Sequence, residues 1–286
     1  MNTKKIAIIT DTNSGISRKE ADESGIILLP MPFIIDGTMH FERIDLSQDE
    51  FYKYLDKDAD ISTSQPSPGD VIDLWNHTLE TYDEIIHIPM SSGLSGSMSS
   101  ANMLAQDFDG KVLVVDNQRI SVTLRQSALD AASWRDAGYS AKEIKEKLED
   151  TALDASIYLS VDTLKYLKKG GRITPAAAAL GTMLNIKPIL QIQGGKLDAF
   201  KKVRGNKAAV REMLKAIEKD MEERFDGKEL YIQTAYSGSV EFGEEWNSVV
   251  KEHFSDYDVY NARLPLSIVC HTGPGVCGVV VMVKND

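Results

Sequence analysis

The residue types best suited to bind an anion lie in a turn rich in serine and glycine at residues 91–97. An apolar run at 85–88 precedes the turn, and a stretch of helical spacing follows at 94–108. Where a parallel strand ends and a helix begins, backbone N–H groups and nearby hydroxyls bind carboxylate or phosphate. Ser95 and Gly96 are therefore candidate binding residues. A plain helix cap is the alternative, since serine is a common N-cap.

A second loop rich in hydroxyl groups spans residues 61–70 and also precedes a helical stretch. Its two prolines favour an extended, rigid backbone. If the two loops converge, Thr63 and Ser95 offer neutral donors to one carboxylate, and Ser64 follows Thr63 in the chain. The alternative is two independent capping loops.

His271 begins a tight turn, H-T-G-P-G, which is rigid enough to aim an imidazole at a ligand. It is one of five histidines, and no two of them have the spacing of metal ligands. The sequence therefore predicts a ligand-directed role for His271 and no metal site.

A serine hydrolase is a competing interpretation of the same residues. The segment G-L-S-G-S at 93–97 resembles the G-x-S-x-G nucleophile elbow, except that Ser97 replaces the last glycine. Ser95 followed much later by His271 matches the chain order of α/β-hydrolases. No acidic partner can be assigned from spacing, so a serine-dependent lipid hydrolase or acyltransferase is the alternative function.

Basic residues gather at 168–172, where two glycines precede Arg172, and again at 201–204, which ends at Arg204. An arginine at such a place can hold a phosphate with two hydrogen bonds. A helix C-terminus and a solvated strand edge are the plain alternatives. The motifs G-x-x-x-x-G-K-[ST] and G-x-G-x-x-G are both missing, so the sequence predicts no nucleotide site of its own and no cofactor.

The overall charge excludes one large class of partner. The chain has 286 residues with 32 Lys and Arg against 43 Asp and Glu, a formal charge of −11. An acidic protein repels the phosphate backbone of DNA and RNA, so nucleic acid is not expected as a partner.

Neither the cysteines nor the apolar segments indicate export or membrane insertion. Cys270 and Cys277 have no zinc-ligand spacing and are interpreted as small core residues in a reducing compartment. The longest apolar run, 276–283, is far below the roughly 20 residues of a membrane span. The N-terminal apolar run, 6–9, is too short for a signal peptide. We therefore expect a cytoplasmic protein.

The pattern of apolar residues predicts an α/β protein with two lobes. Short β-branched runs, at 6–10, 26–35, 84–88 and 112–115, alternate with helical segments, which is typical of a parallel sheet. After about residue 155, strands follow one another directly, with a hairpin signal at Gly194-Gly195. We expect a parallel α/β lobe at 1–155 and a mixed or antiparallel α/β lobe at 156–286.

An ordered set of these segments resembles the DegV family of bacterial fatty-acid-binding proteins. The segments are Thr10-Asp11-Thr12, residues 63–67 (TSQPS), residues 91–96 (SSGLSG), residues 167–173 around Gly170-Gly171-Arg172, residues 187–190 (KPIL), and His271-x-Gly-Pro-Gly. Each is weak alone, but together they span the chain in order.

The resemblance implies a fatty acid in a buried tunnel, with its carboxylate at the interface of the lobes. It implies that Thr63 and Ser95 hydrogen-bond the carboxylate, with Ser64 and Gly96 beside them, and that His271 lies next to it. Members of this family present the acid to a separate ATP-dependent fatty acid kinase, which makes acyl-phosphate for phospholipid synthesis. By analogy, Arg172 and Arg204 serve phosphoryl transfer or kinase docking. No catalytic residue is implied in this chain, and contact with a membrane is at most transient.

Overall fold

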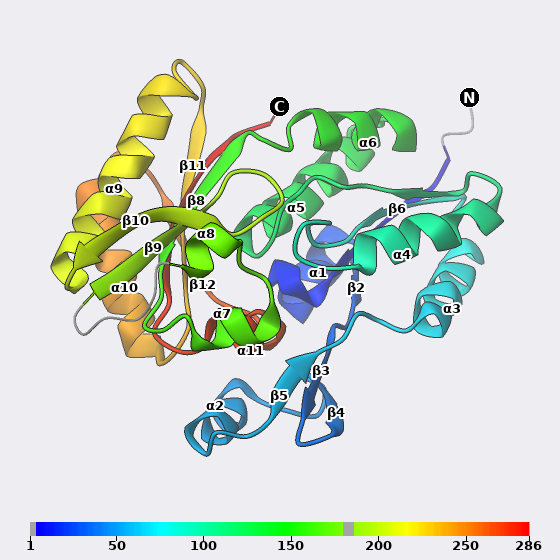
Figure 1. The fold of residues 1–286 in the computed structure, drawn as a ribbon. Helices are drawn as coiled ribbons and strands as arrows, with labels where there is room; N and C mark the ends of the chain where they lie inside the picture. The colour runs from blue at the N-terminus through cyan, green and yellow to red at the C-terminus, as the bar shows by residue number, and fades with distance from the viewer. Residues whose placement is uncertain (1–3, 180–185, 286) are drawn as a thin grey trace. The chain divides into compact units, whose positions relative to one another are not determined.

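The computed structural model describes residues 4–179 and 186–285, which form an α/β protein (Figure 1). Contacts within the chain define two compact units. Unit 1 contains the residues up to Pro32 together with Ser64–Ala152, and unit 2 contains Phe33–Thr63 together with the chain from Leu153 onward. The sequence analysis placed residues 33–63 in the first lobe, whereas their contacts group them with the second.

Unit 1 is built on a parallel sheet of four strands in the order β2-β1-β6-β7. The strands are β1 (Ile6–Asp11), β2 (Ile26–Leu29), β6 (Glu84–Ile88) and β7 (Val112–Val114). All six residues of β1 are buried, as expected for a central strand covered on both faces. The predicted parallel lobe is thus confirmed, but the run predicted as one strand at 26–35 is two strands, β2 and β3, separated at Pro30 and Met31.

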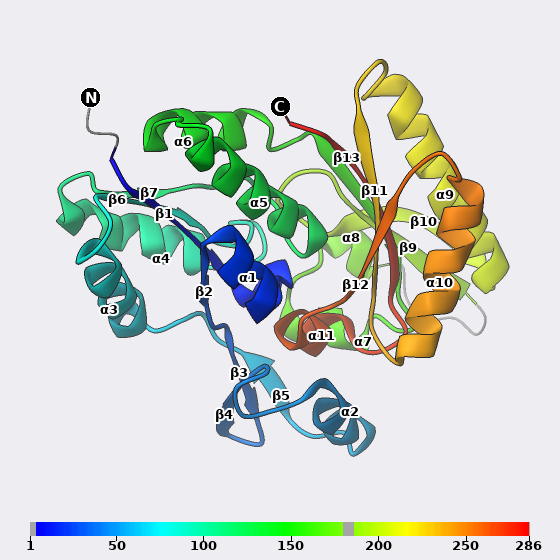
Figure 2. The ribbon, with the colours of Figure 1, turned by 180° about the vertical axis from the view of Figure 1, so that it is seen from behind.

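Helices cover both faces of this sheet (Figures 1 and 2). On one face, α3 (Pro68–Leu79) and α4 (Ser97–Leu104) pack over the strands, and Trp75 is the largest fully buried side chain there. On the other, α5 (Val122–Asp136) contacts β1 and β2, and α6 (Ala141–Asp150) contacts β6 and β7. The remaining helical segments of the unit are η1 (Thr12–Ser14), α1 (Arg18–Ser24) and η2 (Ala105–Phe108).

Unit 2 is built on a mixed sheet of six strands in the order β10-β9-β8-β13-β11-β12. The strands are β8 (Ala155–Ser160), β9 (Ile186–Ile192), β10 (Asp198–Arg204), β11 (Leu230–Tyr236), β12 (Val259–Arg263) and β13 (Cys277–Val283). Only the pair β11 and β12 is parallel. The long helices α9 (Asn206–Glu223) and α10 (Val240–His253) pack on this sheet. The predicted mixed lobe and its hairpin are confirmed.

Residues 33–63 form a small separate sheet within unit 2. Its strands are β3 (Pro32–Ile35), β4 (Thr38–Phe41) and β5 (Ile61–Thr63), and they lie side by side in the order β4-β3-β5. In the chain, α2 (Gln48–Asp56) connects β4 to β5. The segment is held by α7 (Lys165–Gly170) and α11 (Leu266–Thr272). Lys165 pairs with Asp58 and Lys169 with Asp60, both at 2.6 Å. Such pairings across the chain leave no local sequence signal.

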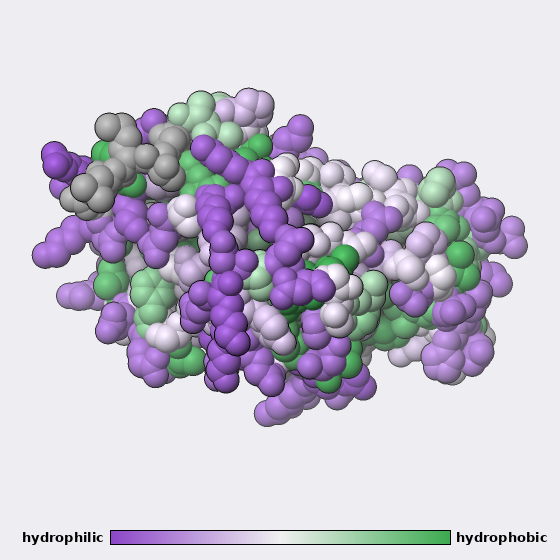
Figure 3. Space-filling model, turned by 60° about the horizontal axis from the view of Figure 1, so that its bottom comes forward, coloured by the Kyte–Doolittle hydropathy of each residue, from purple (hydrophilic) through white to green (hydrophobic). Residues whose placement is uncertain are grey.

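On the face shown in Figure 3, hydrophilic side chains predominate and hydrophobic ones form small separated groups. Within residues 4–179 and 186–285, no helix combines the length and the hydrophobicity needed to cross a membrane. In the same ranges, no three His, Cys, Asp or Glu side chains gather in a way that suits a metal ion.

Candidate functional site

Unit 2 brings together two of the residues singled out from the sequence, Thr63 and His271. Thr63 is the last residue of β5, and His271 lies in the last turn of α11, which packs against β5. The Thr63 hydroxyl Oγ1 and the His271 ring nitrogen Nε2 are 2.7 Å apart, although 208 positions separate them in the chain. The two side chains therefore form one hydrogen-bonded unit that is only partly buried.

The position of the imidazole depends on Gly170, the last residue of α7. A Cβ atom at this position would lie 2.0 Å from Nδ1 of His271, so no side chain fits. The sequence analysis expected the glycines at 170–171 to allow a close approach, and the structure shows that the approaching group is His271. Among the described residues, Nδ1 of His271 has no hydrogen-bond partner.

His271 is neutral at physiological pH. Burial, together with a smaller effect of the positive charge of Arg172, lowers the pKa of its imidazole to about 4. A neutral imidazole has one N–H donor and one bare nitrogen, and the Thr63 hydroxyl can serve either. The pair can thus offer hydrogen bonds to an anion without holding a charge of its own.

Two more glycines shape the turn that follows His271. Gly273 and Gly275 have φ values of +74° and +76°, which favour glycine. A Cβ at Gly273 would lie 2.3 Å from the Tyr166 ring, and one at Gly275 would lie 2.1 Å from Asp162 Oδ2. The predicted rigid turn is present, and its glycines are required by close packing as well as by backbone conformation.

The two candidate arginines lie in different surroundings. Arg172 follows Gly171, the C-cap of α7, donates a hydrogen bond to the Gly170 carbonyl, and is exposed. Its positive charge contributes to the lowered pKa of His271. Arg204 is the exposed last residue of the edge strand β10. The basic cluster at 168–172 is also a helix C-terminus, where cations complement the helix dipole.

In unit 1, the Ser/Gly turn opens α4 as predicted. Ser95 Oγ accepts a hydrogen bond from the Ser97 amide at 3.1 Å and lies 2.8 Å from Ser97 Oγ. Gly96 is the N-cap residue, and a Cβ there would lie 2.8 Å from Gln65 Oε1. Ser64 is exposed, and its hydroxyl donates to the Gln65 carbonyl. Ser95 thus has a capping role, and its hydroxyl remains half-exposed.

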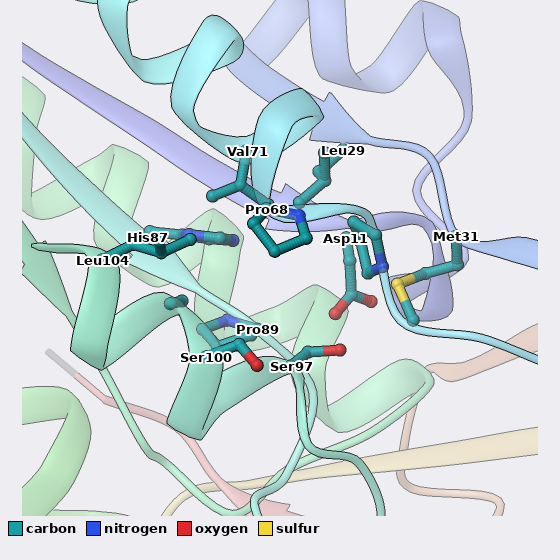
Figure 4. Close-up of a pocket in the computed structure, with 12 residues that line it drawn as sticks. Asp11, Leu29, Met31, Pro68, Val71, His87, Pro89, Ser97, Ser100 and Leu104 are labelled. Atoms are coloured by element: carbon teal, nitrogen blue, oxygen red, sulfur yellow. The ribbon is translucent and has the colours of Figure 1, made fainter.

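A pocket in unit 1 lies beside these residues, at the carboxyl ends of β1 and β6 (Figure 4). The chain runs from β1 outward to β2 and then returns to β6 on the other side of β1. Because the chain leaves the carboxyl ends of β1 and β6 in opposite directions along the sheet, a crevice forms there, and open α/β sheets bind ligands at such places. The space is about 320 Å³, including the part open to solvent. Its apolar lining includes Leu29, Met31, Val71 and Leu104, and its polar lining includes Asp11, His87 and Ser97.

Asp11 connects the two strand ends. Its carboxylate accepts hydrogen bonds from the amide of Met90 at 2.8 Å and from the amide of Asn13 at 2.9 Å. Burial nevertheless raises its pKa to about 6, because the desolvation of the charged form outweighs these bonds. The sequence analysis used Asp11 only as part of a family motif, and its position at the carboxyl end of a buried strand was the available signal.

The serine hydrolase interpretation gains no support from this geometry. In a hydrolase, an acidic group holds the histidine nitrogen that does not face the nucleophile. Nδ1 of His271 faces Gly170 and has no partner among the described residues, while Nε2 is engaged by Thr63. Ser95 also lacks the strained backbone of an elbow, since it is not among the residues with positive φ.

Comparisons with known proteins confirm the resemblance inferred from the motifs. Residues 5–284 match a family model described as "Uncharacterised protein, DegV family". A DegV domain-containing protein of Deinococcus radiodurans is 32% identical over 280 residues, covering 96% of this chain and 98% of that protein. One from Staphylococcus aureus strain N315 is 30% identical over 285 residues, covering 99% and 100%.

Solved structures show the same fold. A DegV family protein from Thermus thermophilus, described by its fatty acid binding, has 31% identity and a TM-score of 0.88, covering 98% of this chain and 100% of that one. DegV from Bacillus subtilis, described as a fatty acid binding protein, has 26% identity and a TM-score of 0.87 at the same coverage. Since sequence and fold agree over nearly the whole length, the chain belongs to the DegV family.

Proposed function

We propose that this protein binds a long-chain fatty acid without converting it, and presents the acid to a separate ATP-dependent kinase. The observation that carries the proposal is the hydrogen-bonded pair of Thr63 and His271, in a chain that matches fatty-acid-binding proteins over its full length. Such a pair suits the recognition of a carboxylate, because it supplies donors without a competing negative charge.

The hydrocarbon chain supplies most of the affinity. Burying the roughly 14 methylenes of a palmitate-sized acid at ~0.8 kcal/mol each contributes on the order of 11 kcal/mol before ordering costs. The polar groups at the carboxylate then set its position more than its affinity.

Thr63, Ser95 and His271 hydrogen-bond the carboxylate in this proposal, with Ser64 and Gly96 beside them. A carboxylate in a low-dielectric site tends to take up a proton, and hydroxyl donors oppose this by stabilising the charged form. An ionised oxygen is also the form that attacks a phosphoryl group.

The kinase supplies ATP and the phosphoryl-transfer machinery. One carboxylate oxygen bonds to the γ-phosphorus, the bond to the bridging oxygen breaks, and ADP leaves, giving an acyl-phosphate for phospholipid synthesis in the cytoplasm. Arg172 is exposed beside His271 and is assigned to phosphoryl transfer or kinase docking, with Arg204 as a further docking residue.

Native mass spectrometry of protein purified from a bacterial host tests the binding function. We expect a mass excess equal to a fatty acid of about 14 to 18 carbons, an acid length that the burial of roughly 0.8 kcal/mol per methylene makes favourable. Protein that carries no lipid and does not retain added labelled oleate contradicts the proposal.

Three alanine variants test the division of roles. Thr63→Ala and Ser95→Ala each remove a hydrogen bond to a charged group, so we expect acid binding to weaken by about ten-fold or more. Arg172→Ala should leave binding unchanged and lower kinase-dependent acyl-phosphate formation. Arg211→Ala, on the exposed surface of α9, is the matched control for loss of an arginine. Equal losses of binding in Thr63→Ala, Ser95→Ala and Arg172→Ala contradict the division.

A further inference from the structure

The helix that carries His271, α11, has no capping side chain of its own at its N-terminus. The first four N–H groups of a helix have no partner within the helix, so they need acceptors from elsewhere. The N-cap residue of α11 is Pro265, whose side chain has no oxygen that could accept a hydrogen bond. A cap for this helix therefore comes from another part of the chain.

Glu42 supplies that cap, although it lies 224 positions away in the sequence. Its carboxylate oxygen Oε2 accepts a hydrogen bond from the amide of Leu266 at 2.8 Å. The other oxygen, Oε1, accepts from Nε2 of Gln48 at 2.7 Å and lies 3.7 Å from Nε of Arg43. Only 8% of the Glu42 side chain is exposed. A buried carboxylate with these donors is held firmly at the N-terminus of α11, because charge-assisted hydrogen bonds are short and strong.

The small sheet of β3, β4 and β5 holds α11 at both of its ends. Glu42 directly follows β4, and Thr63 is the last residue of β5, in register with Phe33 of β3. Glu42 binds the N-terminus of the helix, and Thr63 binds His271 in its last turn. A movement of α11 at the first anchor is therefore transmitted to the second.

Apolar packing sets the orientation of α11 more strictly than its position along the helix axis. Leu266 and Val269 are fully buried, which determines the face of the helix that points inward. Burial of apolar surface is non-directional, whereas a hydrogen bond is lost when its atoms separate beyond roughly 3.2 Å. Thr63 Oγ1 and His271 Nε2 are 2.7 Å apart, so an axial shift of about 1 Å is enough to break their bond.

We propose that Glu42 is a positioning residue of the fatty acid site: by binding the N-terminus of α11, it keeps His271 within hydrogen-bond distance of Thr63. The effect on affinity rests on the proposed fatty acid binding, whereas the effect on the histidine does not. Glu42 acts through the helix and need not touch the acid. Loss of its carboxylate leaves the Leu266 amide without this acceptor and allows α11 to move along its axis.

Two glutamates of the segment 33–63 allow a matched test. Glu42 accepts from the first amide of α11, and Glu50 accepts from the Ser47 amide at 3.0 Å and so caps α2. Each change to alanine removes one capping carboxylate from the same segment. We expect Glu42→Ala to weaken palmitate binding about ten-fold, as for the loss of one hydrogen bond in the site, and Glu50→Ala to leave it unchanged. Titration calorimetry measures both variants.

The ¹⁵N NMR signals of the His271 ring show whether the effect is one of position. In ligand-free Glu42→Ala, the Nε2 signal should move because the bond to Thr63 is lost, and the ring pKa should rise from about 4 toward 6.5 as water reaches the ring. Glu50→Ala should keep the wild-type signals. Glu42→Gln keeps an acceptor oxygen without the charge. Since a charge-assisted bond is roughly twice as strong as a neutral one, this variant should bind palmitate within about three-fold of the wild type.

The outcomes separate this inference from the proposed function. Unchanged His271 signals in Glu42→Ala, or equal changes in Glu42→Ala and Glu50→Ala, overturn the positioning role. It is also wrong if the signals move while the variant binds palmitate as tightly as the wild type does. If the wild type binds no acid, the proposed function is wrong, and the ring signals still decide whether Glu42 positions His271. If Glu42→Ala does not fold, Glu42→Asp takes its place, with a side chain about 1.5 Å shorter, and unchanged ring signals in this variant overturn the inference.

Discussion

The position of His271 depends on a glycine, because a side chain at Gly170 would occupy the place of its imidazole. Gly170 has no Cβ where Nδ1 of His271 lies, and that is what lets the imidazole reach Thr63 at 2.7 Å. Burial then keeps the imidazole neutral. Position and charge state of the same group thus have separate causes, and each can be changed alone.

Gly170→Ala should displace the imidazole of His271. A methyl group 2.0 Å from Nδ1 forces the ring or α7 to move, so we expect the Thr63 hydrogen bond to break and fatty acid binding to weaken by about ten-fold. Gly171→Asn is the matched control, because nothing lies within 4 Å of its Cβ position and asparagine tolerates its φ of +67°. Unchanged binding in Gly170→Ala contradicts the assigned role of His271.

Protonation of buried groups should make stability fall in mild acid. His87 and His271 have pKa values lowered from 6.5 to about 4, so between these values the unfolded chain binds their protons and the folded chain does not. Asp11 acts in the opposite direction, because its pKa is raised from 3.8 to about 6 and the folded chain holds its proton longer. Two effects oppose one, so the free energy of unfolding should fall as pH drops from about 6 to 4.5, by about 1.4 kcal/mol per pH unit.

Urea unfolding at several pH values from 4.5 to 7.5 measures this slope. His87→Gln removes one of the two histidines and should flatten it, while Asp11→Asn removes the opposing carboxyl and should steepen it. A wild-type stability that does not change between pH 6.5 and 4.5 shows that these groups titrate normally in the folded protein.

The sequence indicates residues whose type and spacing suggest binding, but it does not indicate residues whose properties depend on burial in the fold. Thr63 and His271 were predicted as site residues because a hydroxyl-rich loop and a rigid turn can aim such side chains at a ligand, and the structure brings the two side chains together. His87 was not, since it occupies a place in a strand that an isoleucine could fill, and only the fold shows that its nitrogens are unpaired. Asp11 was noted as a motif residue, but its raised pKa depends on burial by distant segments.

At the scale of elements, strands and helices follow the local pattern where burial is uniform and depart from it where the chain changes partners. The strand predicted at 84–88 is β6, residue for residue. The run at 26–35 divides at Pro30 and Met31, because β2 pairs in the parallel sheet of unit 1 and β3 pairs with β5 in unit 2. Hydrophobicity is continuous across the break, so periodicity alone does not reveal it.

Helix packing in unit 2 depends on one small residue, Gly243 of α10. A Cβ at Gly243 would lie 2.2 Å from the ring of Tyr236 in β11, so Gly243→Ala should separate helix and sheet and lower the free energy of unfolding by about 1–3 kcal/mol. Gly69→Ala in α3 is the control, since the nearest atom is an ordinary 3.7 Å away, and it should stabilise by up to about 1 kcal/mol. Thermal unfolding of both variants checks the pair, and similar shifts for the two contradict the packing argument.

For the whole molecule, the feature that sequence patterns miss is that unit 2 is discontinuous. The pattern of predicted elements changes near residue 155, close to the division between Ala152 and Leu153. The chain leaves unit 1 after Pro32 and returns to it at Ser64, and no change in the sequence pattern indicates either point. It is defined by contacts between residues far apart, such as Leu266 with Glu42 and Lys165 with Asp58.

Unit 1 should fold without residues 33–63. The amide of Ser64 donates to the carbonyl of Pro32 at 3.3 Å, so a short Gly/Ser linker can join these two residues at little entropic cost. A fragment that ends at Ala152 and carries this linker should unfold cooperatively in urea. The control is the fragment 1–155 without deletion, which should bind a hydrophobic dye because β3 and β5 lack their neighbours. A gradual, uncooperative transition of the linked fragment contradicts the division into units.

The separation of Thr63 from His271 by 208 positions also has a consequence during synthesis. At about 5–20 residues per second, a ribosome completes α11 on the order of ten to forty seconds after β5 has emerged. Over that interval, the residues of β3, β4 and β5 are present in the nascent chain, but α11, which packs against β5, is not. If Thr63 and His271 bind the ligand as proposed, capture through this pair therefore follows the synthesis of α11.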